Sequence, residues 1–336
     1  MKLVENFTIT DDASSFLGSP IAIYENQIIV KTKSIISGDR VGAYLNDNQV
    51  QDVIGETGRF GISISIYKNV LVIGSSGFSS NKGRAYIYEK NNNSDNWELK
   101  KIVEGNVNNT FLGQSVSVYE NTIAIGRNGT TGVFGETHIY KKIDGNWNLV
   151  QILTGETAGD NFGNYVSLNE NYLAVSAIEF NSTTGKVFIY ELEESWKLVQ
   201  TFQGTAVDES FGSQISLSEN NLSVSNNDGG FFIYTRGVDK KWKLNLTFNS
   251  GIDSSGSTFI YKNIAVYGNV GFSSNTGKIF AFKKNLKGGW ELFDEVQGEE
   301  TGDFYGISVY VNKNYVAAGS QSFNDGKGKA YFYKLE

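Results

Sequence analysis

Residues 110–160 read TFLGQSVSVYENTIAIGRNGTTGVFGETHIYKKIDGNWNLVQILTGETAGD, and residues 161–209 follow with NFGNYVSLNENYLAVSAIEFNSTTGKVFIYELEESWKLVQTFQGTAVDE. Both stretches show a Phe and Gly step, an alternating run and a tight turn ending in Asn. A second apolar run, a Gly-rich loop, the step G-x-x-x-I-Y and the step W-x-L complete the unit. A unit of about 48 residues occurs seven times, and a repeat of that length made of short strands is typical of a propeller blade.

Three kinds of residue mark the copies of this unit. An Asn ends the first turn in all seven copies, at Asn26, Asn69, Asn121, Asn171, Asn220, Asn263 and Asn314. Asn tolerates the left-handed backbone that two-residue hairpins need. An aromatic residue closes the third run at Tyr44, Tyr88, Tyr140, Tyr190, Tyr234, Phe282 and Tyr333. A Trp opens the fourth run at Trp97, Trp147, Trp196, Trp242 and Trp290.

Each unit predicts four strands. The first alternates, as in residues 115–118 (SVSV), the second is more apolar, the third carries paired aromatic residues and the fourth begins at the Trp. Period-two alternation of β-branched and aromatic residues is typical of strands, and no stretch shows helical periodicity with caps. We therefore predict an all-β fold, a seven-bladed β-propeller of four-stranded antiparallel blades.

The two ends of the chain match each other. The last copy stops after its third strand at KAYFYKLE (329–336), and MKLVENFTITDDASSFLG (1–18) matches WKLVQTFQGTAVDESFG (196–212). The N-terminal strand is therefore expected to complete the last blade and close the ring, which removes an open sheet edge. Met1 falls at the Trp position in this alignment. A single domain of residues 1–336 follows, with approximate units 15–58, 59–109, 110–160, 161–209, 210–254, 255–303, and 304–336 plus 1–12.

Composition excludes several classes of partner. The net charge is −7 and no basic stripe occurs, which argues against nucleic acid. No apolar run approaches the roughly 20 residues that span a bilayer, and the first residues lack the apolar core of a signal peptide. Without cysteine, disulfides and thiolate metal sites are excluded. We expect a monomer.

The units resemble FG-GAP repeats, the blades of the integrin α-subunit propeller and of many bacterial surface proteins. Phe60-Gly61, Phe162-Gly163 and Phe211-Gly212 match the FG step, and Phe16-Leu17-Gly18, Phe111-Leu112-Gly113 and Phe304-Tyr305-Gly306 are one-residue variants. The GAP step survives poorly, as in residues 73–75 (IGS) and 318–320 (AGS). The resemblance implies adhesion or ligand binding, outside the cell or on its surface.

The calcium loop of several integrin blades, D-x-D-x-D-G, has no counterpart here. The corresponding turns read Tyr119-Glu120-Asn121, Asn169-Glu170-Asn171 and Tyr67-Lys68-Asn69. Calcium takes six to eight oxygens, usually with several carboxylates from one loop, so we expect no metal and no cofactor.

Catalytic residues are not indicated either. The only histidine, His138, stands where other copies place Tyr86, Phe188, Phe232, Phe280 and Tyr331. It is read as a substitute in an aromatic slot rather than a general base. Without a second His or a Cys, a Cys–His pair is excluded, while a pair of acids remains open for carboxylate chemistry.

Candidate binding residues lie in the loops joining strands two to three and four to one, which share one face of a propeller. The four-to-one loops carry Asp11, Asp12, Glu56, Glu156, Asp160, Asp208, Glu209, Asp253, Glu299, Glu300 and Asp303. The two-to-three loops carry Phe78, Phe134, Phe180, Phe272 and Phe323. Solvated acids and packing between loops are the plain interpretations. The functional one is a partner site of apolar anchors ringed by charge, at the five Phe residues with Asp160, Asp208, Glu209, Glu300 and Asp303.

The sequence thus favours a non-enzymatic binding or adhesion module that uses this face. A protein ligand is favoured over carbohydrate because the loops of blades one and five lack the Phe, so the face is unequal. A multivalent lectin is the alternative, and a carboxylate-based enzyme is third. The Trp series could serve as sugar platforms, but its place at the start of the fourth strand favours packing between blades.

Overall fold

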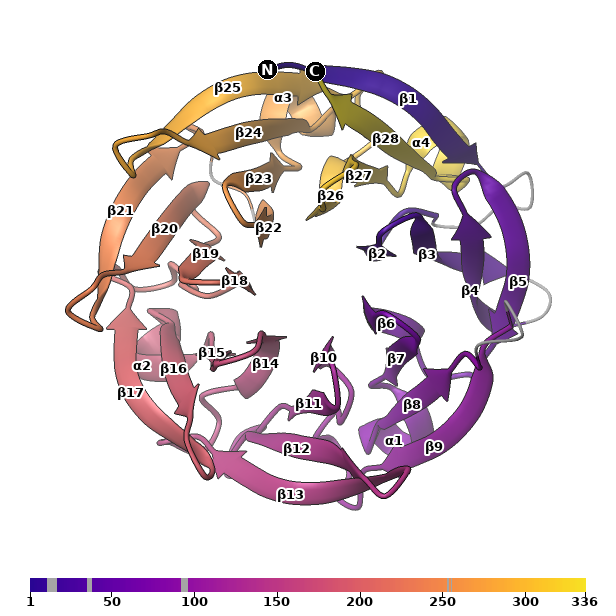
Figure 1. Cartoon of the computed structure of the whole chain (residues 1–336), viewed down its shortest axis with the longest axis vertical. Helices are drawn as coiled ribbons and strands as arrows, with labels where there is room; N and C mark the ends of the chain where they lie inside the picture. Colours follow the sequence, from indigo (N-terminus) through magenta and orange to yellow (C-terminus); the bar gives the residue numbers. More distant parts are fainter. Residues whose placement is uncertain (11–16, 35–37, 92–95, 253, 255) are drawn as a thin grey trace. The chain divides into compact units, whose positions relative to one another are not determined.

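A computed structural model describes residues 1–10, 17–34, 38–91, 96–252, 254 and 256–336. These residues form seven four-stranded antiparallel sheets, so the predicted seven-bladed β-propeller of four-stranded blades is confirmed (Figure 1). The chain divides into two compact units, one of Met1–Ser37, Gly42–Gln49 and Ser213–Glu336, the other of Gly38–Val41 and Val50–Gly212. Blades are numbered in chain order, and the first blade is shared between the units: β2 (Ile21–Tyr24), β3 (Gln27–Ser34), β4 (Gly38–Leu45) and β5 (Asn48–Ile54).

The second unit, which contains residues 50–212, holds three complete blades in chain order. Blade two is β6 (Phe60–Tyr67), β7 (Val70–Ser75), β8 (Arg84–Glu89) and β9 (Glu98–Glu104). Blade three is β10 (Ser115–Tyr119), β11 (Thr122–Arg127), β12 (Glu136–Ile143) and β13 (Asn146–Thr154). Blade four is β14 (Phe162–Leu168), β15 (Tyr172–Ala177), β16 (Lys186–Leu192) and β17 (Trp196–Gln203). One-turn helices α1 (Phe78–Asn81) and α2 (Phe180–Thr183) lie between the second and third strands of blades two and four.

The first unit, which contains both chain ends, holds blades five to seven. Blade five is β18 (Gln214–Ser218), β19 (Asn221–Ser225), β20 (Gly230–Arg236) and β21 (Trp242–Asn249). Blade six is β22 (Gly256–Tyr261), β23 (Ile264–Asn269), β24 (Lys278–Lys284) and β25 (Trp290–Gln297), with α3 (Phe272–Asn275). Blade seven is β26 (Tyr305–Val311), β27 (Val316–Ser320) and β28 (Lys329–Leu335), with α4 (Phe323–Gly326), and takes β1 (Leu3–Thr10) as its fourth strand.

The predicted closure by the N-terminal strand is confirmed, but its register differs from the sequence alignment. Strand β1 pairs with β28, and Figure 1 shows both chain ends at this blade. Leu3 pairs with Leu335 as Trp196 pairs with Leu192, so Leu3 and not Met1 occupies the Trp position. Leu3 is buried there, and its N–H donates to Asp294 Oδ2 at 2.6 Å on the preceding blade. Trp196 N–H donates to Gln151 Oε1 at 2.9 Å in the same way.

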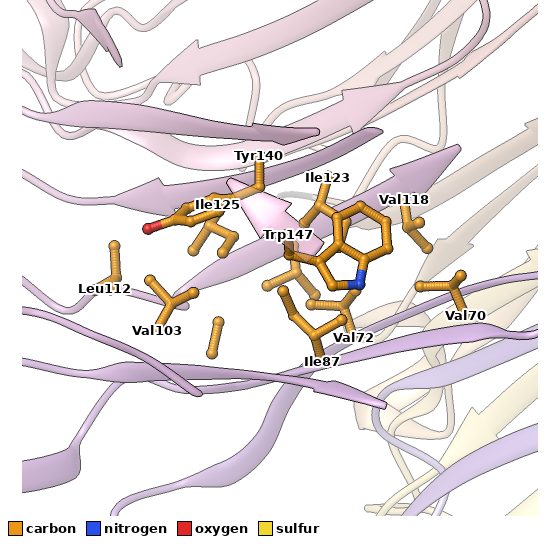
Figure 2. Close-up of a cluster of buried hydrophobic side chains, with 12 residues drawn as sticks. Val70, Val72, Ile87, Val103, Leu112, Val118, Ile123, Ile125, Tyr140 and Trp147 are labelled. Carbon is orange, nitrogen blue, oxygen red and sulfur yellow. The ribbon is translucent and has the colours of Figure 1, made fainter. Parts of the chain in front are cut away.

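Apolar side chains of consecutive blades pack face to face. Between blades two and three, Val72 and Ile87 meet Ile123 and Ile125, with the Trp147 ring closing the outer end of the layer (Figure 2). All five Trp rings are buried, from 2% exposed at Trp242 to 7% at Trp290. The expected packing of the Trp series between blades is confirmed, and the alternative as sugar platforms is wrong because a buried ring offers no face to a ligand.

The serines of the alternating first strands are buried or half-buried between blades. Ser115 and Ser117 of blade three accept hydrogen bonds from the N–H groups of Val166 and Leu168 in blade four, at 2.7 and 3.0 Å. Ser65 accepts from Val118 N–H at 3.0 Å between blades two and three. The alternation therefore reflects two kinds of contact between neighbouring blades, apolar packing and hydroxyl-to-backbone bonds, since a buried N–H must find a partner.

Glycine is required where one blade meets the backbone of the next. A Cβ on Gly74 of β7 would lie 2.0 Å from Gly113 O, and one on Gly126 of β11 would lie 2.0 Å from Gly163 O. The partners Gly113 and Gly163 have φ of +81° and +88°, which side chains rarely tolerate. The Gly of the FG step thus fits against the Gly of the GAP-like step in the preceding blade.

Two features of the turns depart from the sequence analysis. In five of the seven turns the residue with positive φ is the one before the marker Asn, as at Lys68 (φ 53°) before Asn69 and Glu120 (φ 49°) before Asn121. The backbone carbonyl of the Asn instead accepts a hydrogen bond, as where Lys90 N–H donates to Asn69 O at 2.9 Å. Helices α1 to α4 are left-handed turns, as in Ser79 and Ser80 of α1 with φ 46° and 58°. Four residues carry no periodicity, so the sequence did not predict them.

Candidate functional site

The two-to-three and four-to-one loops lie together, as expected. In blade two, Gly77 N–H donates to Gly58 O at 2.9 Å, which joins the α1 loop to the loop before its own blade. On the other side of α1, Phe111 N–H donates to Asn81 O at 2.8 Å, which joins it to the loop that enters blade three. In blade four, Glu179 N–H donates to Asp160 O at 3.1 Å. Backbone bonds therefore fix both loop sets at one end of these blades.

Four of the five predicted Phe residues share one arrangement. Phe78 begins α1, and its ring centroid lies 3.4 Å from Cζ of the Arg84 guanidinium. Arg84 also pairs with Glu56 at 2.9 Å and with Glu104 at 2.7 Å. The other three begin α2, α3 and α4, and each ring centroid lies 4.4 to 4.7 Å from a lysine Nζ. Each lysine in turn pairs with a glutamate. The three sets are Phe180 with Lys186 and Glu156, Phe272 with Lys278 and Glu295, and Phe323 with Lys329 and Glu299. These half-buried rings support their own loops.

Phe134 is different from the other four. It lies directly before Gly135 at the start of β12, whereas Phe78 lies five residues before the equivalent Gly83. The loop 128–135 contains no helical turn, and Phe134 itself is 46% exposed. The sequence analysis placed five Phe residues in one class, but Phe134 occupies a different position in its loop and has an exposed ring.

The acidic residues divide into buried and exposed groups. Asp160 Oδ1 accepts from Phe162 N–H at 2.9 Å and Oδ2 from Thr157 N–H at 3.2 Å, so the carboxylate holds its loop together. Glu209 Oε2 accepts from Thr205 and Ala206 N–H at 2.7 and 3.0 Å, and Asp303 Oδ2 from Glu300 N–H at 3.0 Å. Burial raises the pKa of Asp160 and Asp303 despite these bonds. Asp208 and Glu300 are exposed.

Blade three carries a buried charged cluster that the sequence analysis missed. Arg127 ends β11 with a side chain only 7% exposed, and its Nη2 and Nε bind Glu136 at 2.6 and 3.0 Å. His138 Nε2 lies 2.7 Å from Glu136 Oε2. Burial alone would raise the pKa of Glu136, but hydrogen bonds from Arg127 and His138 outweigh it and lower the pKa.

The aromatic slot assigned to His138 is confirmed by the register. His138 pairs with Ile125 as Tyr86 pairs with Ile73 and Phe188 with Val175. In blades two and four, the slot's ring meets the Phe of the FG step edge to face, with centroids 5.2 Å apart. Blade three has Leu112 in place of that Phe, so its interior at this end is less aromatic and more polar. Comparing the seven copies position by position would have revealed this.

Other sequence predictions have more limited outcomes. Asp11, Asp12 and Asp253 of the acidic series, and Phe16 of an FG variant, lie outside the described residues. Within the described part of the chain, no group of three His, Cys, Asp or Glu side chains could hold a metal ion, and no helix there is long and apolar enough to cross a membrane. The opposite ends of the blades carry the exposed apolar tips Val238 and Leu286, which the sequence analysis did not single out.

No protein-family model matches the chain, and a search of curated proteins finds no match. The resemblance to FG-GAP repeats therefore remains an interpretation of the sequence.

Proposed function

We propose that the chain is a non-enzymatic binding module that engages a partner protein through the loop end at which the two-to-three and four-to-one loops meet. The observation that carries this proposal is Phe134. Its ring is 46% exposed, and it lies on a loop flanked by the Arg127–Glu136 pair. An exposed aromatic anchor beside charged groups is the usual anatomy of a protein contact.

The other four Phe residues support the same face indirectly. Each is held under a cation that pairs with a glutamate, so the loops are fixed before any partner arrives. Pre-organised loops lose little conformational entropy on binding. The buried acids Asp160, Glu209 and Asp303 contribute in the same way, as loop ties rather than ligand contacts.

A multivalent carbohydrate-binding role is the second candidate, and the repetition of the left-handed turns favours it. The turns FSSN, FNST, FSSN and FNDG present exposed hydroxyl and amide side chains at equivalent positions in four blades. A glycan array discriminates the two roles, because a lectin of this kind would bind one sugar class through all four turns.

The test compares an apolar residue at each end of the blades. Phe134→Ser should abolish capture of a protein partner by the immobilised chain, as measured by cross-linking from native extract. The matched control Val238→Ser, in a three-to-four loop, should leave capture of the same protein unchanged. Loss of capture in the control, with retention in Phe134→Ser, would place the contact at the opposite end and refute the proposal.

A further inference from the structure

Two hairpin loops in blades five and six each carry an aliphatic side chain that nothing covers. The loops join the third and fourth strands, as residues 237–241 (GVDKK) in blade five and 285–289 (NLKGG) in blade six. Val238 and Leu286 are fully exposed, at 107% and 108%, whereas Val207, the next most exposed large apolar residue in the described part of the chain, is 65% exposed. Single exposed apolar residues are ordinary on protein surfaces. Full exposure at equivalent positions of two loops calls for a further explanation.

Both loops hold their aliphatic residue in the same rigid turn. The N–H of the first loop residue donates to the carbonyl of the fifth, at 2.9 Å in blade five and 2.8 Å in blade six, and the N–H of the fourth donates to the carbonyl of the first, at 3.0 and 2.9 Å. Val238 and Leu286 are the second residues of these turns. Asn245 Nδ2 of β21 donates to Gly288 O at 3.1 Å, which ties the blade six loop to the fourth strand of blade five. The two tips are therefore fixed at the same end of neighbouring blades.

Exposed lysines without an ion-pair partner among the described residues accompany these tips. Lys284 N–H, directly before the blade six loop, donates to Asn263 O at 2.8 Å, so the one-to-two turn of blade six lies at the same end. Three acids share this end, Glu219, Asp239 and Glu291, and the last two already pair with lysines at 2.6 and 3.5 Å. The end is thus basic although the chain has a net charge of −7. The exposed lysines are Lys240, Lys241, Lys262 and Lys287.

This combination is not a general consequence of the fold. In blade four the same loop reads LEES (192–195), so its apolar residue Leu192 is followed by Glu193 and Glu194 rather than by lysines. The chemistry also favours one kind of partner. Protein contacts usually place aromatic anchors in pockets and are depleted in lysine. Aliphatic side chains flanked by lysines suit a lipid surface, where hydrocarbon accepts them without a pocket and anionic headgroups attract the charges.

We propose that this end of blades five and six docks on an anionic lipid bilayer, with Val238 and Leu286 entering the acyl boundary and the four lysines meeting the headgroups. The contact needs no membrane-spanning segment, because the two tips and the lysines act together at the interface. The inference goes beyond the proposed function, which uses the opposite loop end of the blades. Docking in this way leaves the two-to-three and four-to-one loops of blades five and six facing away from the membrane.

The test is sedimentation of the whole chain with vesicles of phosphatidylcholine, with and without phosphatidylserine. The chain should bind the vesicles that contain phosphatidylserine, and the affinity should fall as salt is added. The double variant Val238→Ser and Leu286→Ser should lose at least about tenfold in affinity with an unchanged melting temperature, because neither side chain packs on the fold. The matched control is Val207→Ser, an exposed valine beside Asp208, and should bind as the wild type does.

Insertion of the tips is measured separately with a fluorophore. The chain contains no cysteine, so Leu286→Cys provides a single position for an environment-sensitive label. Its emission should shift to the blue on binding vesicles, whereas a label at Val207→Cys should not respond. Absence of vesicle binding, equal binding to phosphatidylcholine alone, or full binding by the double serine variant would each overturn the proposal. If the double variant instead loses capture of a protein while the wild type ignores vesicles, the tips form a protein contact and the proposal falls.

Discussion

Blades two and three follow one another in the same unit and share strand order and register, yet their loop ends are built differently. Blade two places a cation, Arg84, at the start of its third strand, between two glutamates and over a Phe ring. Blade three places Glu136 there and moves the cation to Arg127, on the strand beside it. One end is closed by aromatic and ionic contacts, whereas the other keeps an exposed ring. The same fold can therefore hold a structural loop and a candidate ligand loop side by side.

The largest expected effect tests the aromatic core of blade two. Phe60→Ala removes a fully buried ring that packs edge to face on Tyr86, and should lower the free energy of unfolding by about 3–5 kcal/mol. Urea unfolding measures this. Leu112→Ala in blade three, which lacks the aromatic pair, should cost less. A larger loss for Leu112→Ala would remove the distinction between the two interiors.

The two arginines should differ when each is replaced by Met. Arg127→Met leaves Glu136, whose side chain is 24% exposed, without its main partner and should cost about 3 kcal/mol. Arg84→Met leaves two carboxylates that are 59% and 45% exposed and reach water, so about 1 kcal/mol is expected. Equal losses of unfolding free energy in urea would show that the Arg127–Glu136 pair is no more shielded from solvent than the Arg84 pairs.

The two Phe residues should separate stability from binding. Phe78→Ser removes a half-buried ring stacked on Arg84 and should cost about 1–2 kcal/mol. Phe134→Ser removes an exposed ring and should cost less than about 0.5 kcal/mol. Thermal unfolding of both variants checks this, and a stability loss in Phe134→Ser as large as that in Phe78→Ser would assign Phe134 to packing.

Acid should weaken blade three through Glu136. Its pKa is lowered in the folded chain, so its stabilising contribution is fully present above the unfolded-state pKa of about 4.3 and is lost as the pH falls through the lower folded value. The stability difference between the wild type and Glu136→Gln should therefore be largest at pH 6 and shrink below pH 4. A difference that stays constant from pH 6 to pH 3 would contradict the lowered pKa.

The smallest expected effect is that of a chelator. Neither blade places three metal-ligating side chains together among its described residues, so excess EDTA should leave the melting temperature unchanged. A rise of several degrees on adding calcium would reveal a site in the four-to-one loops around Asp160 or Asp303.

The sequence predicted the parts of the fold that depend on local pattern. Seven copies of one unit and the match between the two ends led to the blades and to the closure by β1. The register of β1 was predicted two residues out, because the match of residues 2–4 (KLV) with 197–199 (KLV) aligns Met1 with Trp196, whereas Leu3 takes that place; the bulge between Glu5 and Phe7 recurs in the other fourth strands. The alternating serines predicted strands, but no local sequence signal indicated that Ser115 would accept a hydrogen bond from the backbone of the next blade.

The candidate site was predicted as a face rather than as a set of contacts. Loop lengths and connectivity placed Phe78 and Phe134 at the same end, but only packing distinguishes a ring under a guanidinium from a free one. Asp160 was read as surface acid because a carboxylate in a loop usually meets water, whereas here backbone N–H groups surround it. Arg127 was missed because a lone charged residue at a strand end has no local signal.

The pairing of β1 with β28 has a consequence for the order of folding. As the chain leaves the ribosome, each of blades two to six can form once its own four strands have emerged, because its contacts are close in sequence. Blade seven cannot, because its outer strand is made first and its three inner strands last. Until then β1, with Leu3, Phe7 and Ile9, has no sheet to join. Its exposed apolar side chains make the nascent chain a ready target for chaperones, and make this blade the one whose formation comes last.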